Sequence, residues 1–257
     1  MISSSQNPKI KFARTLTGRP KERREAEAFL AEGVRLVEEA CAANWPFRFV
    51  LYSDELSERG KKLVEKLEDK KIKVEKVEIR LLQSLSETET SQGILAVLSD
   101  SGIPIPESLN FTLIPDSIRD PGNLGTLLRS ADAAGVQAVL IPPETTDAFA
   151  PKVLRSGMGA HFRLPMHTMN WDEIEQVCKS ASLKVYLADI DGQSCWETDF
   201  RQPLALIVGG EADGASELAR KLANAFVKIP MAGKTESLNA AVAGSVLMFE
   251  AMRQRSL

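Results

Sequence analysis

Three short segments of this 257-residue sequence combine glycines with polar side chains that could hold a ligand. Residues 117–123 join Asp, Pro, Gly and Asn, residues 209–214 contain three glycines and a glutamate, and residues 229–239 end in Ser-Leu-Asn. Glycine lets the backbone approach a ligand closely, and these side chains can orient hydroxyl or phosphate groups. Each segment follows an apolar run that predicts a strand. Ligands bind beyond the carboxyl ends of strands in parallel sheets, so the three segments are candidates for one site.

The first segment opens a helix that we predict over residues 122–134. Its leucines form a stripe that would face the core, and Arg129 lies on the opposite side. The arginine can pair with Asp132 in solvent or reach into a pocket. The sequence alone leaves both arrangements open.

The second segment, residues 209–214, does not have the G-x-G-x-x-G pattern of dinucleotide-binding folds. The strand–helix–strand unit predicted over residues 111–141 lacks that pattern as well. A nicotinamide-dependent oxidoreductase is therefore a distant alternative.

The third segment leads into a helix predicted over residues 238–252, for which Ser237 is a suitable N-cap. The helix is apolar on all sides, which predicts a buried position, and small residues at 240–244 leave room for another backbone. Polar residues crowded at its entrance indicate a ligand site. A capped helix in a hydrophobic core explains the same residues without a ligand.

Composition excludes several classes of protein. The chain is 44% apolar and 26% charged, which suits about two globular domains, and no apolar run approaches the roughly 20 residues that span a bilayer. The N-terminus lacks the hydrophobic region of a secretory signal. Three distant cysteines and two histidines argue against a disulfide framework or a metal site. We expect a cytoplasmic protein with no metal and no membrane segment.

Charge is distributed unevenly along the chain. The net charge is −3, but residues 1–24 carry seven basic residues and one glutamate, which gives +6 for this arm and −9 for the remainder. A basic arm on an acidic body is a candidate contact for RNA phosphates, and a solvated helix face is the alternative. The basic residues of the arm are Lys9, Lys11, Arg14, Arg19, Lys21, Arg23 and Arg24.

Strands and helices alternate along the chain, which predicts an α/β protein. In the N-terminal part we expect helices at residues 34–43 and 56–67, strands at 47–52, 72–77 and 93–98, and a helical turn at 79–85. Residues 99–109 contain glycine and prolines without periodicity and are interpreted as a linker. The remaining residues predict a mostly parallel sheet with helices on both faces.

The three segments together resemble the motifs of the SpoU (TrmH-type) RNA ribose 2′-O-methyltransferases of the SPOUT superfamily. Asp-Pro-Gly-Asn-Leu-Gly at 120–125 with Arg129 is similar to the first motif, residues 206–214 to the second and residues 229–239 to the third. Residues 155–160 are similar to a further family segment, and residues 1–98 resemble the ribosomal-protein-L30e-like substrate-binding domain of many members.

The resemblance implies a fold, a cofactor and an assembly. The fold is a trefoil-knotted α/β SPOUT domain at residues 110–257, after a smaller L30e-like α/β domain at 1–98 and the linker at 99–109. The cofactor is S-adenosylmethionine, bound at Gly209, Ile229 and Leu238. Members are typically homodimers with the site near the interface.

The resemblance also implies roles for the polar residues, and the catalytic set carried over is Asn123, Arg129, Glu211, Ser237 and Asn239. A guanidinium is effectively always protonated, so our hypothesis is that Arg129 clamps a phosphate and stabilises the developing alkoxide rather than acting as a base. The expected function is ribose 2′-O-methylation, with ribosomal RNA favoured over transfer RNA. A non-catalytic RNA-binding or assembly protein is the alternative from another class.

Overall fold

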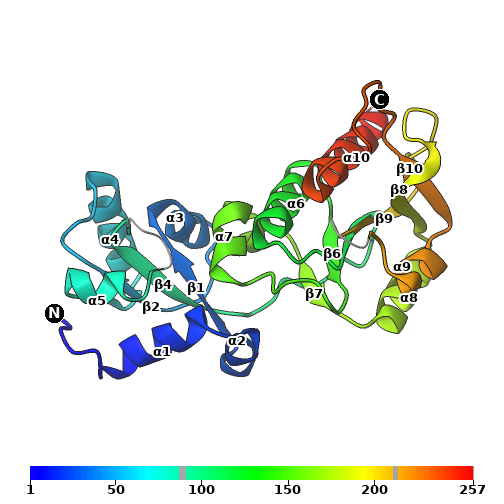
Figure 1. Ribbon diagram of the computed structural model, residues 1–257. Helices are drawn as coiled ribbons and strands as arrows, with labels where there is room; N and C mark the ends of the chain where they lie inside the picture. Colours follow the sequence, from blue (N-terminus) through cyan, green and yellow to red (C-terminus); the bar gives the residue numbers. More distant parts are fainter. Residues whose placement is uncertain (87–90, 211–213, 257) are drawn as a thin grey trace. The chain divides into compact units, whose positions relative to one another are not determined.

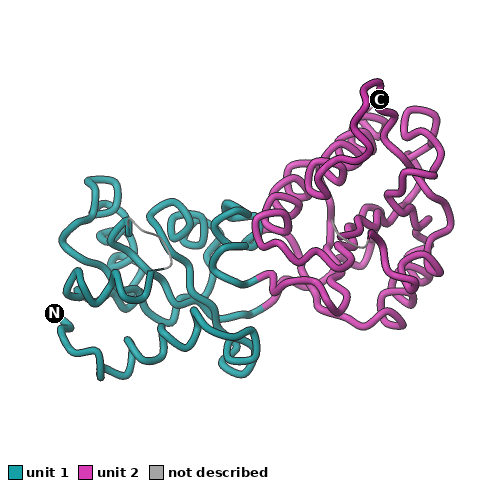
Figure 2. The backbone as a smooth tube through the Cα atoms, viewed as in Figure 1, with its two compact units in different colours: residues 1–101, 149–162 teal, residues 102–148, 163–257 magenta. Residues whose placement is uncertain are grey.

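The computed structural model describes residues 1–86, 91–210 and 214–256, and the chain folds into two compact units (Figure 2). Unit 1 comprises residues 1–101 and 149–162, and unit 2 comprises residues 102–148 and 163–257. The ranges expected from the sequence assign residues 149–162 to the C-terminal domain and treat residues 99–109 as a linker, whereas the division between the two units falls after residue 101. Among the described residues, no helix is both long and apolar enough to cross a bilayer.

Unit 1 is built around a mixed sheet in the strand order β1-β4-β2-β3, with β1–β4 and β4–β2 antiparallel and β2–β3 parallel. Its elements are α1 (Pro8–Thr17), α2 (Pro20–Ala26), β1 (Ala28–Glu32), α3 (Val34–Ala42), β2 (Phe47–Tyr52), α4 (Glu58–Asp69), β3 (Val74–Lys76), α5 (Ile79–Gln83), β4 (Ile94–Ser99), α7 (Pro151–Gly157) and the 3-10 turn η1 (Ala160–Phe162). The predicted alternation of strands and helices is confirmed from α3 onward.

Strand β1 and helix α2 are absent from the sequence-based prediction. All five residues of β1 are buried, so the strand shows no alternation of apolar and polar residues. Its sequence, AFLAE, also consists largely of residues that favour helices. Pairing with β4 over its whole length overrides that preference.

Residues 149–162 complete the core of unit 1, although they follow β6 of the other unit in the sequence. The Phe29 ring on β1 lies 4.8 Å from the Phe149 ring and 6.4 Å from the Phe162 ring, measured between centroids, and Trp45 lies 5.4 Å from Phe162. Arg155 forms an ion pair with the buried carboxylate of Glu32 at 3.2 Å. Unit 1 therefore needs two separate stretches of chain for its hydrophobic core.

Unit 2 contains a parallel sheet with strand order β10-β8-β9-β5-β6-β7 within the described residues (Figure 1). Its elements are β5 (Phe111–Asp116), α6 (Pro121–Ala133), β6 (Ala138–Ile141), β7 (Met166–Thr168), α8 (Trp171–Ser180), β8 (Lys184–Ser194), β9 (Leu204–Gly209), α9 (Glu217–Leu222), β10 (Ala225–Lys228) and α10 (Ala240–Arg255). The parallel sheet and the predicted β5–α6–β6 unit are confirmed.

Helix α6 starts where its sequence predicts. Asp120 is the N-cap, its carboxylate accepts the Asn123 N–H at 2.8 Å, and Pro121 occupies the first turn, where its missing N–H costs nothing. The leucine stripe is buried as expected. Helices α6 and α10 lie side by side, and the hydroxyls of Ser130 and Ser245 hydrogen-bond between them at 2.7 Å (Figure 1).

Helix α10 differs from its prediction at two points. Asn239, not Ser237, is the N-cap, because the Asn239 amide oxygen accepts the N–H groups of the first helical turn. The helix is also not buried all round: Val242 and Phe249 are 48% and 41% exposed. Gly244 does provide the expected close approach, since a Cβ there would lie 2.4 Å from the Leu127 side chain of α6.

Arg255 links the end of α10 to the backbone just before β5 and β9. Its guanidinium donates to the backbone carbonyls of Phe200, Asn110 and Gln202 at 2.6–2.9 Å and lies 4.9 Å from the centre of the Phe111 ring. Partial burial lowers the pKa of this arginine. The planar fork donates from separate nitrogens to carbonyls of different segments, whereas the donors of a lysine all sit on one nitrogen.

We expect Arg255→Ala to lower the free energy of unfolding by about 2–4 kcal/mol, because three carbonyls lose a charged donor. Urea denaturation followed by circular dichroism measures this change. Arg201→Ala is the matched control: Arg201 forms an exposed pair with Asp199, and solvent screening makes the loss of such a pair much less costly. Equal losses in the two variants would contradict the assigned role of Arg255.

Candidate functional site

A cavity of about 910 Å³ lies in unit 2 beyond the carboxyl ends of β9 and β10 and beside the start of α10. Gly209, Ile229 and Leu238, the three residues predicted to bind the cofactor, all line it. Gly209 comes from the second segment, and Ile229 and Leu238 come from the third, and the parallel sheet brings these two segments to one edge. Ser237 and Asn239 of the predicted catalytic set line the same cavity.

The glycines of the turn after β9 are required by packing within the protein. A Cβ on Gly209 would lie 2.7 Å from the Ala215 nitrogen, and one on Gly210 would lie 2.4 Å from the Ser117 carbonyl oxygen. Neither glycine has a positive φ, whereas Gly214 does, at +67°. These glycines are expected from the sequence to let the backbone approach a ligand, and for Gly209 and Gly210 the contact between neighbouring turns is an equally strong reason.

Asn123 and Asn239 are brought together from positions 116 residues apart in the sequence. The Asn239 oxygen accepts the Ala241 N–H at 2.9 Å, which fixes the amide so that its nitrogen donates to the Asn123 oxygen at 3.1 Å. The start of α6 is thereby joined to the start of α10. Two members of the predicted catalytic set thus share a hydrogen bond at the rim of the cavity.

Arg129 lies elsewhere on α6. Its side chain is exposed, and the residues that line the cavity do not include it. Pairing with Asp132, the alternative left open by the sequence, is not observed among the described residues, because Asp132 binds Arg163 at 2.9 Å. The fifth member of the set, Glu211, lies outside the described residues.

One wall of the cavity was not found by sequence reasoning. The pairing of β10 with β8 shifts register between Phe226 and Val227, so residues 188–192 bulge from β8, and Asp189, Ile190 and Asp191 line the cavity. Asp189 forms an ion pair with Arg220 at 2.7 Å, which holds the bulge in place. Two acidic residues directly after an apolar strand are a signal that could have placed them at this edge.

The basic residues of the N-terminal arm do not form one uniform surface. Lys11, Arg14, Arg19, Lys21 and Arg24 are exposed on α1, α2 and the turn between them.

The other two basic residues of the arm serve unit 1 itself. Lys9 forms an ion pair with Glu75. The buried Arg23 donates to the carbonyls of Leu16 and Gly18 at 2.8 and 2.9 Å, which satisfies backbone oxygens at the end of α1.

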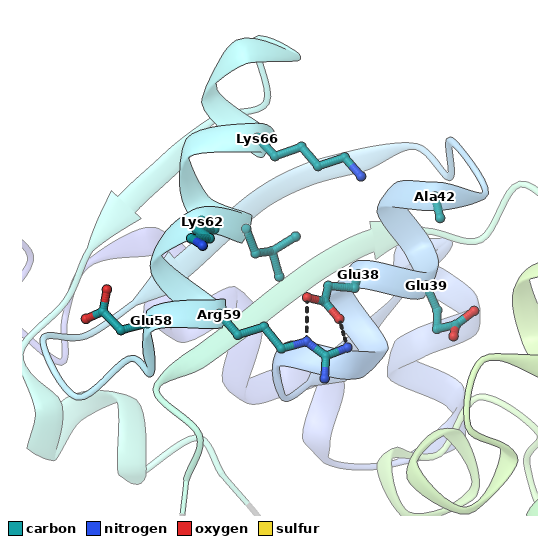
Figure 3. Close-up of a pocket in the computed structure, with 8 residues that line it drawn as sticks. Glu38, Glu39, Ala42, Glu58, Arg59, Lys62 and Lys66 are labelled. Atoms are coloured by element: carbon teal, nitrogen blue, oxygen red, sulfur yellow. Dashed lines mark hydrogen bonds and ion pairs between the residues drawn. The ribbon is translucent and has the colours of Figure 1, made fainter.

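A second cavity, of about 550 Å³, lies in unit 1 between α3 and α4 (Figure 3). Its charged side chains include both signs, and Arg59 binds Glu38 across it, with 2.8 Å between Nε and Oε1. None of the residues predicted to bind a ligand lines this cavity. Within the ranges 1–86, 91–210 and 214–256, no cluster of three or more His, Cys, Asp or Glu side chains is suited to hold a metal ion.

Comparison with known proteins relates both parts of the chain to RNA methyltransferases. Residues 110–249 match the SpoU rRNA Methylase family, and residues 7–96 match the MRM3-like substrate binding domain. The 23S rRNA (guanosine(2553)-2′-O)-methyltransferase RlmP of Bacillus subtilis is 34% identical over 254 residues, which cover 96% of this chain and 97% of that protein. A 23S rRNA (uridine(2479)-2′-O)-methyltransferase of Streptomyces viridochromogenes is 32% identical, over 98% and 92%.

Solved structures agree with these sequence relationships. An AdoMet-bound rRNA methyltransferase from Sinorhizobium meliloti superposes with a TM-score of 0.85 at 30% identity, over 98% of this chain and 97% of that one. The SpoU methyltransferase AviRb from Streptomyces viridochromogenes, in complex with AdoMet, gives the same TM-score over 97% and 99% of the two chains. The family implied by the three motifs is confirmed, and this chain belongs to the SpoU rRNA Methylase family.

Proposed function

We propose that this protein transfers a methyl group from S-adenosylmethionine to a ribose 2′-hydroxyl of ribosomal RNA. The observation that carries the proposal is the gathering of Gly209, Ile229 and Leu238 around one cavity in a chain of this family. The relatives described above are named as 23S rRNA 2′-O-methyltransferases, which favours ribosomal RNA over the transfer RNA alternative. The same relationships favour an enzyme over a non-catalytic assembly protein.

The cavity suits S-adenosylmethionine in size and chemistry. Its volume of about 910 Å³ lies at the upper end of the range for small-molecule sites. Apolar side chains such as Val208 and Leu247 line it together with the backbone of the glycine turn. When bound, the cofactor supplies a methyl group activated on a sulfonium sulfur.

Within this proposal the residues of the chain hold the acceptor ribose. The hydrogen-bonded amides of Asn123 and Asn239 orient the sugar, together with the Ser237 hydroxyl. The role expected for Glu211, to hold Arg129 or the loops, is part of the same proposal. Arg129 clamps the phosphate beside the target ribose and stabilises the negative charge that develops on the 2′-oxygen as it takes the methyl group and its proton passes to water. Positioning accounts for much of the rate of such an in-line displacement.

We further propose that the protein is a homodimer that pairs through α10. Val242 and Phe249 expose apolar side chains on the same helix that forms one side of the cavity. A second chain on this face would bury them, and a site at such an interface explains why Arg129 lies outside the cavity of a single chain. We also propose that the segments around the cavity form the trefoil knot that the family resemblance implies.

RNA binding by unit 1 is assigned to the five exposed basic residues of the arm. They lie on α1, α2 and the connecting turn, in the stretch that matches a substrate-binding domain. Lys9 and Arg23 are left out of this assignment because both have structural partners. We also propose a cytoplasmic location, because all three cysteines are free thiols, as is usual in a reducing compartment.

Arg129→Lys should reduce kcat on ribosomal RNA by roughly 100-fold while leaving cofactor affinity unchanged, because lysine keeps the charge but loses the fork. Single-turnover methylation with labelled cofactor measures the rate, and calorimetry measures the affinity. Arg201→Lys, at an exposed arginine of the same unit, is the control. Near-normal activity of Arg129→Lys would remove the clamp from the mechanism.

Replacing Lys11, Arg14, Arg19, Lys21 and Arg24 with glutamine should weaken RNA binding and reduce the slope of log K against log salt by about 3 to 4. Substitution is preferable to deletion of residues 1–24, since Ile10, Ala13 and Leu16 lie in the core. Glutamine at Lys61, Lys62 and Lys66 of α4 is the control. An unchanged slope would exclude the arm as a phosphate contact.

Phe249→Glu should convert the homodimer to monomers, because a charge replaces an apolar side chain proposed to lie in the interface. Sedimentation equilibrium should show a dissociation constant raised by about 100-fold or more. Trp196→Glu, at another exposed aromatic residue, is the control. A wild-type protein that sediments as a monomer at micromolar concentration would refute the dimer.

A further inference from the structure

Asp116, the last residue of β5, is an acidic residue that the sequence motifs do not include. Its side chain is 1% exposed, and a carboxylate buried to this extent must be compensated by donors. One oxygen accepts the backbone N–H of Ser216 at 2.6 Å, and the other accepts the Ser117 hydroxyl at 3.2 Å. The short distance between the Ser216 nitrogen and the carboxylate oxygen marks this hydrogen bond as a firm attachment.

Two residues connect the Asp116–Ser216 hydrogen bond to the wall of the cofactor cavity. Gly214 and Ala215, which directly precede Ser216, line the cavity together with Gly209. The Ala215 backbone is pressed against Gly209, where a Cβ would approach it to 2.7 Å. Moving Ser216 away from Asp116 would therefore displace the residues that shape this side of the cavity.

The segment that carries Asp116 does not itself depend on the carboxylate. The Thr145 hydroxyl donates to the Pro115 carbonyl at 2.6 Å, and the Thr146 N–H donates to the Ile118 carbonyl at 2.9 Å. The register of β5 against β9 also continues to Asp116 opposite Gly209. Because these contacts hold the segment around Asp116 without its carboxylate, we assign the carboxylate to holding residues 214–216.

We propose that Asp116 is a positioning residue for the cofactor: it holds residues 214–216 in the conformation that the cavity needs. The inference rests on the proposed function for its ligand, S-adenosylmethionine, but the attachment itself belongs to the free protein. Its effect falls on cofactor affinity rather than on the transfer step, because Asp116 lies behind the wall and does not line the cavity.

The test compares Asp116→Ala and Asp116→Asn with the full-length wild type. Glu250→Gln is the matched control, since it alters another buried carboxylate of unit 2, which binds Arg253 and Gln254. Calorimetry gives the dissociation constant for S-adenosylmethionine at a temperature where every variant is folded by circular dichroism. Amide hydrogen exchange of the cofactor-free protein reports on the Ser216 N–H.

Asp116→Ala should raise the dissociation constant at least roughly tenfold and speed exchange at Ser216, with kcat at saturating cofactor within about threefold. Asp116→Asn keeps an acceptor oxygen and should restore part of both properties. Glu250→Gln should retain wild-type affinity. This pattern supports positioning by Asp116.

Wild-type affinity in both Asp116 variants would overturn the inference, and so would an equal loss of affinity in Glu250→Gln. If Asp116→Ala does not fold, Asp116→Asn with wild-type affinity and wild-type exchange at Ser216 overturns it alone. Failure of the proposed function is a separate result: a wild type that binds the cofactor but methylates no ribosomal RNA refutes the activity, while the affinity and exchange data still decide the role of Asp116.

Discussion

The parallel pairing of β5 with β9 is the constraint on which the cavity depends. The two strands pair over six residues, and the pairing ends with Asp116 opposite Gly209. The turns that follow β5 and β9 therefore begin next to each other at the same edge of the sheet. Each turn then contacts the other through backbone atoms, with Gly210 against the Ser117 carbonyl. A slip of one residue in this register would reverse the side chains of a strand that is buried on both faces.

The cavity is shaped by backbone and amide groups more than by charged side chains. The glycine turn, the Asn123–Asn239 hydrogen bond and the start of α10 supply fixed dipoles, and these need little reorganisation when a ligand binds. Such a surface suits a cofactor with a sulfonium, an amino acid part and a nucleoside part. Among the charged residues that line the cavity, Asp189 and Arg220 form an ion pair with one another at the bulge of β8.

The sequence predicts the parts of this fold that have a regular pattern or a turn residue with a fixed role. The β5–α6–β6 unit and the parallel sheet follow from apolar runs and glycine or proline boundaries. The residues proposed to bind the cofactor follow from the motif resemblance. Features that depend on tertiary contacts are not predicted from the sequence. Strand β1 lacks an alternating pattern, and Arg23 is buried because it donates to backbone carbonyls of unit 1. The bulge at residues 188–192 arises because β10 pairs with β8 on both sides of it.

The insertion of residues 149–162 into unit 1 has a consequence for synthesis on the ribosome. Phe29 is made early, but its ring partners Phe149 and Phe162 are made only after residues 102–148 of unit 2 have been translated. At about 5–20 residues per second, the 61 residues between positions 101 and 162 take roughly 3 to 12 s. During that interval the nascent N-terminal part exposes an incomplete core, which makes it a substrate for chaperones that bind apolar chain.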